Sequence, residues 1–207
     1  MKLVLVRHGE TSSNVRMVLD SRPPGPPLTE AGRAQAAALA EALAAEPVAG
    51  VYASTALRAR QTAEPVAAAH GLEVEVVEGV QEIFCGDLEG RHDRAAFEEF
   101  IAVVRRWGEG EVDVPVPGGE TARQVLDRFL VAVDRVAARH ADGETAVLVS
   151  HGGALRMAAL ALAANVRPAL AEAGLLPNTG RVVLERTPGG WLCTSWTGVD
   201  VAEGLPR

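Results

Sequence analysis

The chain has 207 residues, enough for one α/β domain with a full core, and its 48% hydrophobic content excludes a disordered protein. Its net charge of −7 argues against nucleic acid or an anionic membrane as a partner, because both require a basic face. A small anionic ligand needs only a local cluster of cations. No segment approaches 18 apolar residues, so we expect no membrane span. We treat residues 1–207 as a single domain.

The cysteines and the N-terminus both indicate a cytoplasmic protein. Cys85 and Cys193 are the only cysteines, and their spacing does not match that of metal ligands, so we expect reduced thiols. The apolar run near the N-terminus has four residues, which is too short for a signal peptide.

Strands and helices are predicted to alternate in the first half of the chain. Residues 2–6 form an apolar run typical of a buried parallel strand. The proline-rich residues 22–27 that follow can be neither helix nor central strand. Thr29 is expected to cap an alanine-rich helix that ends near residue 45. The next predicted elements are a strand at 50–53, a helix from Ser54 or Thr55 to residue 69, and a strand at 72–77.

The second half is predicted to be mostly helical before it closes in a hairpin. Helices are expected at 92–107 and 120–140, and a strand at 145–149 leads into a helix that ends near residue 164. Residues 181–186 and 191–196 are predicted to pair as the hairpin, whose exposed edge leaves a homodimer open. This order predicts a three-layer α/β/α sandwich with a mostly parallel central sheet. His92 and His140 lie among charged residues, and we expect both to be exposed.

Two histidines follow predicted strands directly. His8 comes after the first strand, and His151 comes after the strand at 145–149. Ligands of parallel sheets bind in the crevice beyond the carboxyl ends of the strands, so both side chains are candidates for a site.

Cations and glycines near these strand ends indicate an oxyanion pocket. Arg7 offers a planar fork that matches phosphate, and Arg58 lies near the start of a helix that follows a strand. Gly152 allows backbone N–H groups to approach a ligand closely. We therefore predict a pocket for a tetrahedral dianion.

A histidine that attacks phosphorus must present one neutral ring nitrogen while a hydrogen bond holds the other. The leaving alkoxide needs a proton from a nearby acid. Glu82 is the best candidate because it lies on a short apolar segment at the end of a strand region; Asp87 and Glu89 are near in sequence and remain alternatives.

The sequence resembles the histidine phosphatase superfamily, in the branch that includes cofactor-dependent phosphoglycerate mutases and related phosphatases. A lone Arg-His-Gly would be weak support, but several motifs occur in the family's order over nearly the whole chain. They are Arg7-His8-Gly9-Glu10-Thr11 with Asn14, residues 28–33, residues 54–63 around Arg58, Glu82 with residues 86–90, Gly119-Glu120-Thr121, and Ser150-His151-Gly152-Gly153.

The resemblance implies a phosphoglycerate mutase-like fold and a role for each residue. His8 would carry the phosphoryl group, and Glu82 would donate the proton and later act as the base for water. The residues implied to bind phosphate are Arg7, Asn14, Arg58, His151 and Gly152. No metal or other cofactor is implied, and the partner would be a small phosphorylated metabolite.

Two departures from the family pattern concern the substrate. Many relatives have a Gln-Gly after the asparagine, whereas this chain has residues 19–24, in which Asp20 would repel a second anionic group and Arg22 would attract one. Mutases usually carry a longer basic insert after the acidic motif, whereas residues 91–100 are short and mixed in charge. These features favour a phosphatase; a mutase and a non-catalytic phosphate-binding module are the alternatives.

Overall fold

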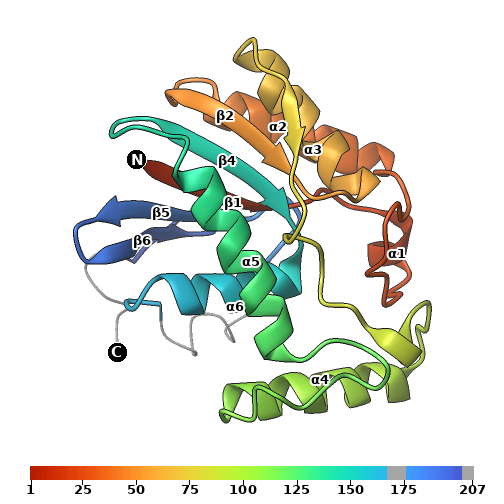
Figure 1. Ribbon diagram of the computed structural model, residues 1–207. Helices are drawn as coiled ribbons and strands as arrows, with labels where there is room; N and C mark the ends of the chain where they lie inside the picture. Colours follow the sequence, from red (N-terminus) through yellow and green to blue (C-terminus); the bar gives the residue numbers. More distant parts are fainter. Residues whose placement is uncertain (167–175, 202–207) are drawn as a thin grey trace.

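The computed structural model describes residues 1–166 and 176–201 and contains a seven-stranded sheet flanked by helices (Figure 1). The strand order is β3-β2-β4-β1-β5-β6-β7. The strands are β1 (Lys2–Arg7), β2 (Val48–Ala53), β3 (Val74–Val76), β4 (Thr145–Ser150), β5 (Arg181–Thr187), β6 (Gly190–Trp196) and β7 (Val199–Asp200).

The sheet is mostly parallel, as the sequence predicts. β3, β2, β4 and β1 all pair in parallel, and β5 pairs with β1 in antiparallel fashion. β6 is antiparallel to β5 and therefore points the same way as β1, so only β5 and β7 run in the opposite direction. The carboxyl ends of β1 and β4 are adjacent, with Arg7 opposite Ser150 in the register. Both histidine motifs consequently start at the same edge of the sheet.

Alternation of side chains along β1 divides the core into two layers, because successive residues of a strand face opposite sides. Leu3 and Leu5 belong to the cluster under α5 (Ala122–Ala137) and α6 (Gly152–Leu162). Val4 and Val6 belong to the cluster under α2 (Glu30–Leu43) and α3 (Leu57–Ala69). The predicted three-layer sandwich is confirmed.

Local signals explain where several helices begin. The Thr29 side chain accepts a hydrogen bond from Gly32 N at the start of α2, and Thr121 forms a capping box with Gln124 at the start of α5. The Asp93 side chain caps α4 (Arg94–Gly108), which lies apart from the sheet, beside one end of α5 (Figure 1).

Some details differ from the sequence-based expectations. A short helix, α1 (Ser12–Val15), and a 3-10 turn, η1 (Gly86–Leu88), form within segments for which no element was predicted. The prediction that His140 is exposed is wrong: its side chain is 4% exposed and lies 2.9 Å from the Tyr52 hydroxyl through Nε2. Within residues 1–166 and 176–201, no helix combines the length and apolar character needed to cross a bilayer.

Candidate active site

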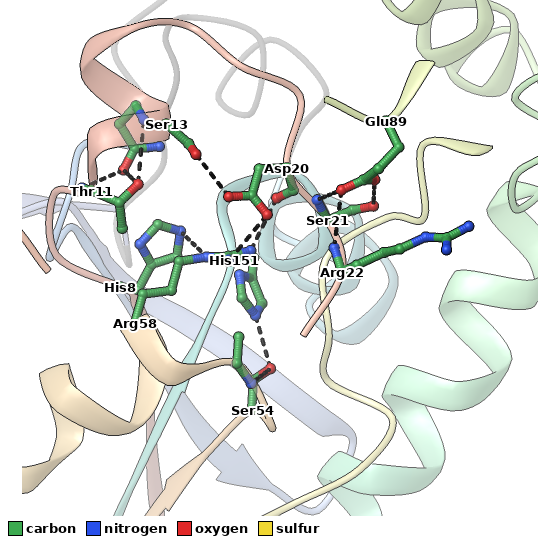
Figure 2. Close-up of polar contacts among 12 residues, drawn as sticks. His8, Thr11, Ser13, Asp20, Ser21, Arg22, Ser54, Arg58, Glu89 and His151 are labelled. Carbon is green, nitrogen blue, oxygen red and sulfur yellow. Dashed lines mark hydrogen bonds and ion pairs between the residues drawn. The ribbon is translucent and has the colours of Figure 1, made fainter. Parts of the chain in front are cut away.

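His8 follows β1 directly and is held in one tautomer by two contacts. Its Nδ1 lies 2.7 Å from the Gly9 carbonyl oxygen, which can only accept, so Nδ1 carries the proton. The guanidinium of Arg58 can only donate, and its Nε is 3.2 Å from His8 Nε2. The second ring nitrogen is therefore the acceptor, with its lone pair directed toward Arg58 (Figure 2).

His151 lies against His8, with the two ring centroids 5.2 Å apart at an angle of 61°. It is the N-cap residue of α6, and its Nε2 is 2.8 Å from the Ser54 hydroxyl oxygen (Figure 2). Its Nδ1 is buried and has no hydrogen-bond partner among the residues that the structure describes. Such a nitrogen can take part in binding a ligand.

Burial and nearby cations keep both imidazoles neutral. Burial lowers the pKa of His8 well below 6.5, and the positive charge of Arg58 lowers it further. The pKa of His151 is lowered in the same direction, again by burial first and Arg58 next. A neutral His8 keeps the lone pair that a nucleophile requires.

Arg7 and Arg58 are anchored by carbonyl groups and keep other N–H groups unsatisfied. Arg7 Nη1 donates to the Leu176 carbonyl at 2.6 Å, and Arg58 Nη2 donates to the Asp20 carbonyl at 3.0 Å. Arg7 Nε and Arg58 Nη1 are buried without a hydrogen bond to any described residue. Burial lowers the pKa of both guanidinium groups. Buried cationic N–H groups that lack a hydrogen-bond acceptor favour an anionic acceptor beside them.

Glu82 is held at the N-terminus of α6. Its carboxylate accepts backbone hydrogen bonds from Ile83 at 2.9 Å, Gly153 at 3.1 Å and Ala154 at 2.8 Å. A Cβ atom on Gly153 would lie 2.8 Å from Glu82 Oε1, so glycine is needed for this close approach. From the other side, Arg128 Nη2 donates to the Glu82 carbonyl at 2.9 Å and fixes the backbone.

Asn14 is placed by the capping box of α1. Its Oδ1 accepts from the Thr11 backbone N–H at 3.0 Å and from Asn178 Nδ2 at 3.3 Å. Asn178 Nδ2 also donates to the His8 carbonyl at 2.9 Å. The sequence analysis did not single out Asn178, because it lies in a loop far along the chain and has no recognisable motif around it.

Asp20 lies against Arg58 in the loop that departs from the family pattern. Its Oδ1 is 3.6 Å from Arg58 Nη1, and its Oδ2 accepts from the Ser13 hydroxyl at 2.8 Å (Figure 2). Glu89 holds the next residue of the loop by accepting from the Ser21 backbone N–H at 2.9 Å and from the Ser21 hydroxyl. The loop is thus tied to the segment after Glu82.

A cavity of about 990 Å³ brings these groups together. All the predicted site residues except His151 line it: Arg7, His8, Asn14, Arg58, Glu82 and Gly152. His151 is fully buried behind His8. Neither Asp87 nor Glu89, the alternatives to Glu82, is among the lining residues. Arg156 also lines the cavity, although nothing in the sequence around it indicates this.

Comparison with known proteins shows the family. The sequence profile of the Histidine phosphatase superfamily (branch 1) matches residues 3–198. The chain belongs to the histidine phosphatase superfamily. Its membership agrees with the two histidine motifs at one edge of the sheet, as the resemblance noted in the sequence leads one to expect.

Relatives of this histidine phosphatase superfamily member include enzymes named as phosphatases. A metal-independent phosphoserine phosphatase of Arabidopsis thaliana is 34% identical over 203 residues, covering 96% of this chain and 82% of that protein. A mycobacterial glucosyl-3-phosphoglycerate phosphatase, solved in complex with VO3, superposes with a TM-score of 0.80 at 27% identity, covering 96% and 99% of the two chains.

The similarity also extends to a longer protein. The PE-PGRS family protein PE_PGRS11 of Mycobacterium tuberculosis is 34% identical over 212 residues, a match that covers 95% of this chain. This chain spans only 36% of the length of that relative.

Proposed function

We propose that the protein hydrolyses phosphate monoesters of small metabolites, with His8 as the nucleophile. The observation that carries this proposal is the state of the His8 ring. Its Nδ1–H is bound to the Gly9 carbonyl, and its Nε2 lone pair faces Arg58 inside the cavity. A nucleophilic histidine needs its proton held on the ring nitrogen that does not attack, and Nε2 can attack when a phosphoryl group takes over its hydrogen bond from Arg58.

The reaction would take two steps. In the first, His8 Nε2 attacks phosphorus, the bond from phosphorus to the ester oxygen breaks, and Glu82 in its acid form protonates the leaving oxygen. In the second, Glu82 takes a proton from water as the water oxygen attacks the phosphorus of phosphohistidine, the bond from phosphorus to His8 Nε2 breaks with its electron pair returning to Nε2, and inorganic phosphate leaves. At the end of the second step, His8 is again neutral and Glu82 is again in its acid form.

The charge of the transferred phosphoryl group would be stabilised by the groups around His8. Arg7 and Arg58 each have a buried N–H, and His151 has a buried Nδ1, that forms no hydrogen bond with any described residue. Asn14 and the backbone at Gly152 complete the proposed phosphate site. Donors fixed in place before the reaction are the largest contribution that a site can make to such a transfer.

Hydrolysis is favoured over a mutase reaction by the charges around the cavity. The Asp20 carboxylate lies beside Arg58, where it would repel a second anionic group on the substrate. After the acidic motif, Arg91 pairs with Asp93 at 2.8 Å and Arg94 pairs with Glu98 at 2.6 Å. Neither Arg91 nor Arg94 is among the described residues that line the cavity, and each is paired with a neighbour, so neither is placed to hold the carboxylate of a phosphorylated sugar acid.

The proposal is tested by incubating the protein without added metal with p-nitrophenyl phosphate and a panel of phosphorylated metabolites. Phosphate release should occur and should vanish in His8→Ala, because that variant has no nucleophile. Release that persists in His8→Ala would refute the mechanism. No release from any compound, followed by isomerisation of phosphoglycerate, would identify a mutase; binding without either reaction would identify a binding module.

A further inference from the structure

The cavity that holds the phosphate site continues into an apolar chamber. Its far wall is one face of α4, and the facing walls come from the start of α5 and from α6. In Figure 1, α4 lies beside the lower end of α5 and is separated from α6. The half-buried apolar side chains that line this part are Phe97, Phe100, Val104, Leu126, Met157 and Leu160.

Four of the five charged side chains in the described lining of the cavity lie around His8: Arg7, Asp20, Arg58 and Glu82. The fifth, Arg156, lies on α6 between Gly152 and Leu160. The charged residues of α4 do not line the cavity, and α4 presents only apolar side chains and Gly108 to it.

The polar atom of the tryptophan in this wall is already satisfied. Trp107 Nε1 donates to the Val114 carbonyl oxygen at 2.7 Å. The indole N–H is therefore occupied, and the ring contributes apolar surface to the chamber. A charged group entering the space beside α4 would lose its hydration without gaining a partner of opposite charge from α4.

We propose that this chamber binds the alcohol part of the substrate and that the preferred substrates are phosphate monoesters of hydrophobic alkyl or aryl alcohols. This inference rests on the proposed phosphatase function. The phosphate would sit at His8, and the hydrocarbon would extend between α4 and α6. A volume of about 990 Å³ is far larger than a phosphate group needs. It lies at the upper end of the roughly 300–1,000 Å³ typical of small-molecule sites.

The first experiment measures kcat/KM for straight-chain alkyl phosphates from ethyl to octyl, with phosphoserine as the polar comparison. We expect kcat/KM to rise by up to about fourfold for each methylene that the chamber buries. Phosphoserine should be hydrolysed no faster than ethyl phosphate. If kcat/KM does not rise with chain length while release still depends on His8, the inference is overturned and the proposed function stands. If nothing is released, the proposed function itself has failed.

A matched pair of variants on α4 tests whether the dependence on chain length arises in the chamber. Val104 lines the chamber, whereas Ile101, one turn earlier, is 51% exposed. Val104→Asn should lower kcat/KM for octyl phosphate at least tenfold with little change for ethyl phosphate, and Ile101→Asn should change neither. Equal loss on both substrates in Val104→Asn, with unchanged folding by circular dichroism, would overturn the inference.

A filling variant provides an independent readout that a folding defect would not mimic. Val104→Phe keeps the wall apolar but occupies part of the chamber. The chain length that gives the highest kcat/KM should become shorter by one or more methylenes. An unchanged optimum would show that the alkyl chain does not occupy the space beside α4.

Discussion

Glu82→Gln should slow the hydrolysis of alkyl phosphates far more than that of aryl phosphates. An alkoxide is a poor leaving group and needs the proton that Glu82 would supply, whereas nitrophenolate leaves readily without one. General acid catalysis contributes roughly 10²–10⁴-fold, and we expect a loss in this range for ethyl phosphate. For p-nitrophenyl phosphate the loss should stay below about tenfold.

The structure also predicts a stability effect of the same substitution. Ile83 and Ala154 both donate to Glu82 Oε1, so the amide oxygen of glutamine can replace that acceptor. Oε2, which accepts from Gly153 N at 3.1 Å, would become an NH₂ group facing another donor. Leaving the Gly153 N–H without an acceptor should lower the free energy of unfolding by about 1–3 kcal/mol. This loss of stability does not depend on the substrate, so it cannot produce a difference between alkyl and aryl phosphates.

The assay is kcat for a series of phosphate monoesters plotted against the pKa of the leaving alcohol, with urea denaturation of the same variants. Glu82→Gln should make the dependence on the leaving group steeper than in the unsubstituted protein. Glu89→Gln is the matched control, because Glu89 binds the Ser21 loop and does not line the cavity. Glu89→Gln should lower kcat for all substrates to the same extent. Equal losses on alkyl and aryl esters in Glu82→Gln would refute the assignment of Glu82 as the acid.

Three further predictions concern pH, charge and metal. Unfolded His8 takes up a proton below about pH 6.5 and folded His8 does not, so acid should lower the free energy of unfolding. In urea denaturation below about pH 6.5, His8→Ala should reduce the slope of the free energy of unfolding against pH by up to about 1.4 kcal/mol per pH unit. An identical pH dependence in the two proteins would contradict a buried, neutral His8. The lysine of Arg58→Lys keeps the charge but cannot contact both His8 Nε2 and the Asp20 carbonyl, so kcat/KM should fall about 100-fold. A loss below threefold would show that the charge alone is sufficient. Activity should be unchanged in EDTA, because the phosphoryl charge is assigned to arginines, and a strict metal requirement would point to a different chemistry.

The architecture was largely readable from the sequence. Apolar runs that end at Arg7 and Ser150, alternation along β1 and the threonine caps at Thr29 and Thr121 are local patterns, and each is set by neighbours in the chain. Short elements were less predictable: α1 depends on the Asn14 side chain reaching the Thr11 backbone, and single-turn helices carry too few residues to show a period.

Contacts between distant segments were decided by the tertiary structure. The sequence placed His8, Arg58 and Glu82 among the candidate residues, but only the fold brings Arg58 Nε to His8 Nε2 and seats Glu82 on the first turn of α6. His140 was expected to be exposed because its neighbours in sequence are charged, yet Tyr52 from β2 covers it. The apolar chamber exists because α4 is separated from α6, which leaves a space between the two helices. Hydropathy patterns report which side of an element is buried, whereas the shape left between elements is set by packing that no local pattern encodes.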